Sequence, residues 1–127
     1  MSESKLLYAE LSHDIIGAAM FVLNELKPGL DEKLYENALV IELRDRGHKV
    51  DQQTRYPVDF KGHHIGELVP DLVVDDIVVV DPKVASQFSK SHIAQMIGYL
   101  NITELDLAIL LNFKYATLQW KRILADR

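Results

Sequence analysis

The sequence predicts a single α/β domain, spanning residues 1–127, in which helices flank a mixed β-sheet. The chain has 127 residues, of which 48% are hydrophobic, and this length and composition suit one compact domain. Apolar residues recur at helical spacing in the N-terminal third, and β-branched runs replace that period after Gly47. A further helical segment separates two last strands from the others. The expected order is αα-βββ-α-ββ, with an N-terminal helix in residues 1–27 and a core in residues 29–125.

Two helices are expected at the start of the chain. The first should cover residues 4–26, where apolar side chains recur every three or four positions at Leu7, Leu11, Ile15, Ala18, Val22 and Leu26. Its apolar face either covers the sheet or supplies a dimer surface. The second should cover residues 31–46, with Asp31 as the N-cap and Gly47 as the C-terminal stop.

The period then changes to that of β-strands. Residues 48–60 and 65–74 read as two strands of a hairpin around the turn Lys61-Gly62. Asp75-Asp76 makes a second turn, and the β-branched run at residues 77–80 predicts a central strand buried on both faces. The remaining elements are a helix at 89–100 and strands at 105–111 and 115–124.

Charge and composition exclude several classes of function. Lys and Arg number 14 against 19 Asp and Glu, so the net charge of −5 argues against a protein that coats nucleic acid electrostatically. The acidic charge does not exclude a nuclease, because carboxylates that bind a metal cation add negative charge to the metal-free chain. The chain has no cysteine, which excludes disulfides, thiolate metal sites and thiol catalysis. No apolar run is long enough for a membrane span and the N-terminus is too polar for a signal peptide, so we expect a cytoplasmic protein without a membrane partner.

Asp71, Asp81 and Lys83 form the strongest candidate site. If the strands around the Asp75-Asp76 turn pair as a hairpin, Asp71 and Asp81 come close at one end of the sheet, and Lys83 points to the same face as Asp81. Two carboxylates suit Mg²⁺, and a lysine can orient or deprotonate a water molecule there. The Pro82 carbonyl is a further available ligand. The competing structural interpretation is that aspartates are simply common at strand ends and in turns.

Two helices could add polar groups to this site. Glu32, Tyr35 and Glu36 share one face of the second helix, so a third carboxylate could reach the metal. The structural alternative is that Glu32 complements the helix dipole while Tyr35 packs in the core. Gln95 and Tyr99 share a face of the third helix, either as solvated residues or as a pair that positions a phosphate or the attacking water.

Together these motifs resemble the GxxExxY family, a group of small bacterial proteins in the PD-(D/E)XK nuclease superfamily. The likeness runs from about residue 14 to residue 122. The residues that carry it are Gly29, Glu32, Tyr35, Glu36-Asn37-Ala38-Leu39, Glu42-Leu43-Arg44, Lys61-Gly62, Ile65-Gly66-Glu67, Pro70-Asp71, Asp81-Pro82-Lys83, Gln95 and Tyr99. The family usually shows Glu-Leu-Lys where this chain has Asp81-Pro82-Lys83.

The resemblance implies a restriction-endonuclease-like core of the αβββαβ type. Asp71 and Asp81 would be metal ligands, Lys83 the catalytic lysine, and Glu32 or Glu36 the carboxylate of the first core helix. Gln95 and Tyr99 resemble the Gln-x-x-x-Tyr motif of RecB-like nucleases.

Two functions are consistent with these motifs. The first is a nuclease that uses Mg²⁺ or Mn²⁺ to hydrolyse phosphodiester bonds in DNA or RNA. The second is a nuclease-like binding or regulatory module without turnover, acting with a protein partner or as a homodimer. The variant Asp81-Pro82-Lys83, the acidic charge and the small size motivate the second.

Overall fold

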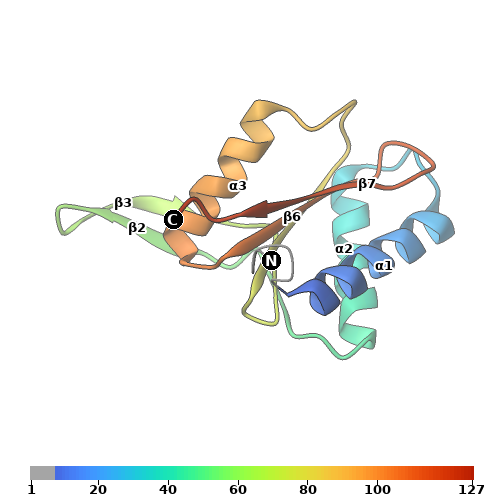
Figure 1. Ribbon diagram of the computed structural model, residues 1–127, viewed down its shortest axis with the longest axis horizontal. Coiled ribbons are helices and arrows are strands. Elements are labelled where there is room, and N and C mark those ends of the chain that lie inside the picture. Colours follow the sequence, from blue (N-terminus) through green and yellow to red (C-terminus); the bar gives the residue numbers. More distant parts are fainter. Residues whose placement is uncertain (1–7) are drawn as a thin grey trace, which may run out of the picture.

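The computed structural model describes residues 8–127 and confirms the α/β prediction: a mixed sheet flanked by helices (Figure 1). Helix α1 covers Ala9–Leu26 and helix α2 covers Glu32–Asp45. The first four residues predicted for the first helix, 4–7, lie outside the described residues. Asp31 occupies the predicted N-cap position of α2, although its side chain caps no backbone N–H. Gly47 follows α2 with a φ of 93°, the left-handed geometry that glycine adopts most easily at a helix end.

The main sheet has five strands in the order β1-β4-β5-β6-β7, and a second sheet has only β2 and β3. Strand β5 is central: it pairs antiparallel with β4 and parallel with β6, and helix α3 makes the crossover between β5 and β6. The bounds are β1 Val50–Gln52, β2 Tyr56–Phe60, β3 His63–Leu68, β4 Leu72–Val74, β5 Val78–Lys83, α3 Lys90–Thr103, β6 Leu107–Asn112 and β7 Gln119–Leu124.

The predicted hairpin of residues 48–60 and 65–74 is present but interrupted, which corrects the two continuous strands. Near the turn its arms are β2 and β3, and nearer the core they are β1 and β4. The two ladders have the same register where they face each other, with Tyr56 opposite Leu68 and Val50 opposite Val74, and a β-bulge shifts the register of the ribbon after Val58. The Gln53 N–H still donates to the Asp71 carbonyl at 2.9 Å. Beyond that bond the pairing stops, because Gln53 has a φ of 57° and Pro70 lacks an N–H.

Later elements are shifted relative to the prediction. Helix α3 continues to Thr103, three residues beyond its expected end, and its N-cap is Ser89, whose hydroxyl accepts the N–H of His92. Strand β7 begins at Gln119 rather than at Tyr115, because residues 113–118 form the connection from β6. Strand β5 ends at Lys83, three residues beyond the β-branched run at residues 77–80, and it continues through Pro82.

The helices divide the core into two layers. Helices α1 and α2 cover one face of the main sheet, where Ile15, Leu39 and Ile109 are fully buried. Helix α3 covers the other face through Met96 and Leu100. The amphipathic first helix therefore packs on the sheet. No helix within residues 8–127 is long and apolar enough to cross a membrane.

Candidate active site

Asp71 and Asp81 come together at one end of the central hairpin. Leu72 lies opposite Val80 in the β4–β5 ladder, so continuing the register places Asp71 opposite Asp81. Asp81 is 2% exposed. Its Oδ2 atom lies 3.4 Å from the Lys83 Nζ atom, and its Oδ1 atom has no hydrogen-bond partner among the described residues. The structure thus brings together the aspartates and the lysine that the sequence singled out.

The two carboxylates perturb each other. Burial, followed by the neighbouring Asp71 carboxyl, raises the pKa of Asp81 to about 8, and Lys83 offsets these two effects only in part. At neutral pH the pair therefore retains a proton unless a cation replaces it. A buried oxygen without a partner, beside a second carboxylate, has the chemistry of an incomplete cation site.

Pro82 lies between Asp81 and Lys83 without disturbing strand pairing. The Lys83 carbonyl accepts the N–H of Phe113, so Lys83 directs its backbone toward β6. Backbone groups of successive strand residues point to opposite sides, so the Pro82 nitrogen and carbonyl point to the side where β4 has already ended. No ladder hydrogen bond is therefore lost at Pro82, and its carbonyl points to the side of β5 on which Asp71 lies.

Glu36 is linked to the aspartates through one glutamine. Its side chain is 3% exposed, which is unusual for a carboxylate. Its Oε2 atom accepts from Gln52 at 2.7 Å, from Gln53 at 3.1 Å and from Lys33 at 2.9 Å. The Gln53 amide also donates to Asp71 Oδ1 at 3.1 Å. Sequence reasoning missed both glutamines, since nothing in their spacing signals that the interrupted hairpin turns them toward α2.

Glu32 takes a different position from Glu36. Its Oε1 atom accepts the N–H of Val84 at 3.0 Å, directly after Lys83. Glu32 therefore fixes the backbone that leaves β5, whereas Glu36 belongs to the network around Asp71. The intervening Tyr35 points into the core, where its ring stacks on Phe113 with centroids 4.8 Å apart.

Gln95 and Tyr99 complete the site from α3. The Lys83 ammonium donates to Gln95 Oε1 at 3.5 Å, and the Gln95 amide donates to the Tyr99 hydroxyl at 3.0 Å. Burial raises the pKa of Tyr99, and the charges of Asp81 and Asp71 raise it further. The lysine is thus held between Asp81 and an α3 side chain.

A buried asparagine supports the segment after Lys83. Asn112 is fully buried at the end of β6, opposite Lys83 in the register. Its amide donates to the Ala85 carbonyl at 2.7 Å, and its Oδ1 atom accepts the Ala85 N–H at 3.1 Å. This residue was not singled out from the sequence, although a polar residue at the end of an apolar strand was the available signal.

The donor set fits Mg²⁺ or Mn²⁺ better than a metal that needs a full protein cage. In the part of the chain that the structure describes, no three His, Cys, Asp or Glu side chains gather into a metal site. Mg²⁺ commonly binds one or two carboxylates and completes its shell with water and substrate phosphate. Asp71, Asp81 and the Pro82 carbonyl are the groups placed to supply such ligands.

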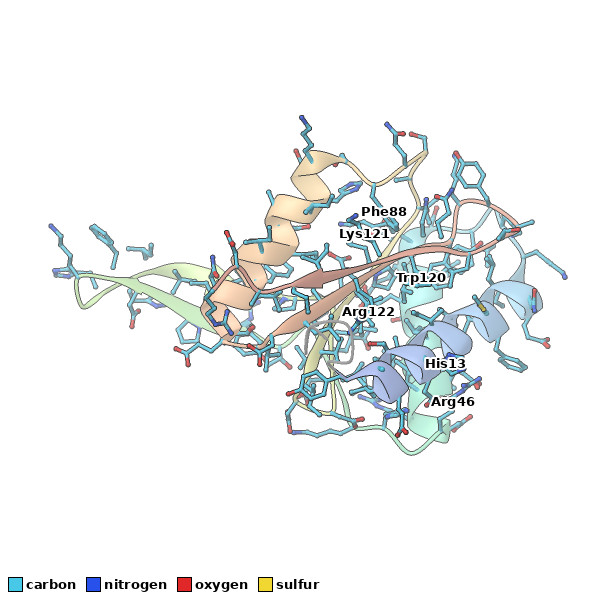
Figure 2. All side chains as sticks on the ribbon, in the orientation of Figure 1. His13, Arg46, Phe88, Trp120, Lys121 and Arg122 are labelled. Atoms are coloured by element: carbon cyan, nitrogen blue, oxygen red, sulfur yellow. The ribbon has the colours of Figure 1, made fainter. Side chains whose placement is uncertain are left out.

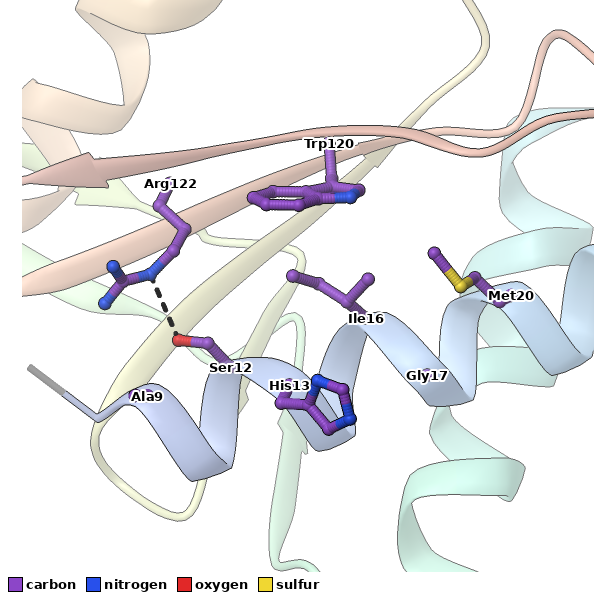
Figure 3. A pocket seen from close by; sticks show the side chains of 8 residues that line it. All are labelled: Ala9, Ser12, His13, Ile16, Gly17, Met20, Trp120 and Arg122. Carbon is purple, nitrogen blue, oxygen red and sulfur yellow. Dashed lines mark hydrogen bonds between the residues drawn. The ribbon is translucent and has the colours of Figure 1, made fainter. Parts of the chain in front are cut away.

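A pocket of about 320 Å³ lies elsewhere, between α1 and β7 (Figure 3). Trp120 and Arg122 line it from the strand, on the side opposite Lys121 (Figure 2). Arg122 donates to the buried Ser12 hydroxyl at 3.2 Å. In the strand register, Trp120 and Arg122 lie opposite Leu111 and Ile109, whose side chains face α1 and α2. Asp81 lies opposite Leu110, whose side chain faces α3 on the other side of the sheet. The pocket is therefore separate from the paired carboxylates.

Comparison with known proteins gives the family of the chain. The chain belongs to the PD-(D/E)XK nuclease superfamily, whose family model matches residues 9–123. Among solved structures, an alkaline exonuclease from Laribacter hongkongensis is similar at 14% identity, with a TM-score of 0.48 over 85% of this chain and 76% of the exonuclease. No curated protein matches the chain significantly.

Proposed function

We propose that this chain is a nuclease of the GxxExxY type that hydrolyses phosphodiester bonds in DNA or RNA with Mg²⁺ or Mn²⁺. The observation that carries the proposal is the buried Asp81 carboxylate, which has one unpartnered oxygen, Asp71 beside it and Lys83 at 3.4 Å. Membership of the PD-(D/E)XK nuclease superfamily supports the same function.

Asp71, Asp81 and the Pro82 carbonyl would hold the cation, with Glu36 next to them through Gln53. A bound divalent cation would supply charge stabilisation for the phosphoryl oxygens and acidify a water molecule. Asp81 would have to lose its proton to hold the cation, because only its carboxylate form can act as a ligand.

Lys83 would act on the attacking water or on a phosphate oxygen. Its side chain is 16% exposed and contacts Asp81 and Gln95, so it stands at the boundary between the carboxylates and solvent. Gln95 and Tyr99 keep the ammonium in one orientation, which is the positioning that a hydrolytic site requires. Glu32 and Asn112 fix the backbone on the far side of Lys83.

The test is a cleavage assay on single- and double-stranded DNA and RNA with Mg²⁺ and Mn²⁺. The variant Asp81→Asn removes the metal-binding charge, and Asp45→Asn, at an exposed position at the end of α2, is the matched control. We expect Asp81→Asn to lower the cleavage rate at least about 100-fold, while Asp45→Asn cleaves like the wild type. Equal rates in Asp81→Asn and wild type would refute the proposed site.

One observation favours the second candidate, a nuclease-like module that binds without turnover. The third carboxylate, Glu36, already accepts three hydrogen bonds and is not in the carboxylate pair itself. In that case purified protein would bind nucleic acid or a protein partner and cleave no substrate with either metal, and Asp81→Asn would bind as tightly as the wild type.

A further inference from the structure

The β2–β3 ribbon is the part of the interrupted hairpin that extends beyond the main sheet (Figure 1). It is the outer part of the interrupted hairpin, so the ribbon and the β1–β4 ladder are joined at Gln53 and Asp71. Two large apolar side chains on it face solvent: Phe60 is 60% exposed and Ile65 is 64% exposed. Both side chains are therefore accessible to a binding partner.

The turn of the ribbon presents a lysine in an unfavourable backbone conformation. Lys61 has a φ of 50° and Gly62 a φ of 78°, the paired positive values of a type I′ hairpin turn, where asparagine is the usual first residue. The Lys61 ammonium lies 5.5 Å from the centre of the Phe60 ring. The turn therefore holds the Lys61 ammonium at the exposed tip of the ribbon.

The ribbon differs in charge from the rest of the acidic chain. From Arg55 to Glu67 the formal charges cancel when histidine is neutral, whereas the whole chain carries −5. Both acidic residues pair within the ribbon: Glu67 lies 2.8 Å from Arg55, and Asp59 lies 3.5 Å from His64. The cation that the tip presents is Lys61, so the ribbon repels phosphate less than the body of the molecule does.

The ribbon also begins at the candidate active site. Tyr56, at its base, packs in the layer of α3, the helix that carries Gln95 and Tyr99. Because side chains alternate along a strand, Phe60 lies on the same face of β2 as Tyr56. A strand of five residues spans roughly 15 to 17 Å, which corresponds to about five base pairs of duplex.

We propose that the β2–β3 ribbon is an arm that binds the flank of a DNA duplex about five base pairs from the cleaved phosphodiester. Lys61 contacts a phosphate, and Phe60 makes an apolar contact in the groove. A two-stranded ribbon fits the major groove of B-form DNA, whereas the major groove of duplex RNA is too deep and narrow. This inference rests on the proposed nuclease function.

The test measures the affinity of metal-free protein for a 20-base-pair DNA duplex, by fluorescence anisotropy over a range of salt concentrations. Lys61→Asn removes the charge but suits the turn, and Phe60→Ser removes the ring at an exposed position. Lys121→Asn is the matched control, because Lys121 lies on β7, the edge strand farthest from β1 and the ribbon. We expect Lys61→Asn and Phe60→Ser each to weaken binding about three- to tenfold, and Lys61→Asn to reduce the salt slope by about 1.

Three results would overturn the ribbon assignment. The first is duplex binding by both ribbon variants equal to that of Lys121→Asn. The second is an equal loss of affinity for single-stranded DNA and duplex RNA. The third is unchanged duplex binding with altered self-association in sedimentation, which would assign the ribbon to protein contact. The nuclease proposal is separate: it fails if wild-type protein cleaves nothing, and it stands if Asp81→Asn binds the duplex without cleaving it.

Discussion

Replacing Tyr35 with phenylalanine should destabilise the fold while leaving the chemistry of the site intact. Tyr35 is the last residue of the Gly-x-x-Glu-x-x-Tyr pattern and is fully buried. Its hydroxyl accepts the Leu30 N–H at 3.2 Å and donates to the Lys27 carbonyl. Both partners lie in the connection between α1 and α2, so one hydroxyl closes that connection over the core.

The expected cost follows from those two hydrogen bonds. Each is worth about 0.5 to 1.5 kcal/mol, and removing the hydroxyl leaves the Leu30 N–H and the Lys27 carbonyl without this partner. The free energy of unfolding should therefore fall by about 2 kcal/mol. The ring itself remains, and its stacking on Phe113 at an interplanar angle of 12° is preserved in the variant. The loss is therefore smaller than a truncation to alanine would produce.

Urea unfolding of wild type and Tyr35→Phe measures this difference, with an unchanged m-value as the sign that the denatured state is the same. Tyr115→Phe is the matched control, because the Tyr115 hydroxyl also donates to a backbone carbonyl, that of Ser86, but its side chain is 41% exposed. Its loss should stay below about 0.5 kcal/mol, since water replaces the bond. A Tyr35→Phe loss no larger than that of the control would refute the reasoning.

Three further predictions concern charge and catalysis. Asp81 has a pKa raised to about 8, so the folded metal-free protein binds more protons than the unfolded chain, and stability should fall as pH rises from about 4 to about 8. Asp81→Asn should abolish that fall in thermal unfolding. Burial lowers the pKa of His48, but hydrogen bonds and charges from Asp14 and Asp75 outweigh it and raise the pKa overall. The stabilisation from His48 is therefore complete below about pH 6.5 and is lost as pH rises through the folded-state pKa. His48→Gln should remove this loss from the urea midpoints measured between pH 6 and 8. Lys83→Met should lower the cleavage rate about 100-fold without weakening Mn²⁺ binding, whereas Lys90→Met should do neither.

Local patterns predicted the juxtaposition of Asp71 and Asp81 because it depends on a short connection. The turn at Asp75-Asp76 has positive φ values at both residues, 55° and 57°, and joins two apolar strands, which fixes the register over a few residues. The end of α3 was predicted less well, since the helix continues to Thr103, three residues beyond its expected end.

Residues that meet through long-range packing could not be predicted in the same way. Gln53 contacts Glu36 only because the hairpin is interrupted and α2 lies over the gap. The sequence placed Glu32 and Glu36 on one helix face, but only the packing of α2 against β1 separates the buried Glu36 from the exposed Glu32. Pro82 does not disturb the strand because β4 has already ended beside it, and the residues around Pro82 do not reveal where β4 ends.

The most direct test of the central claim is a calorimetric titration of Mn²⁺ into wild-type protein and into Asp81→Asn. The claim is that Asp71 and the unpartnered oxygen of Asp81 form a cation site. We predict a stoichiometric binding event with proton release in the wild type, because the metal displaces the proton that the pair retains at neutral pH, and no such event in Asp81→Asn. Identical titration curves for the two proteins would contradict the claim.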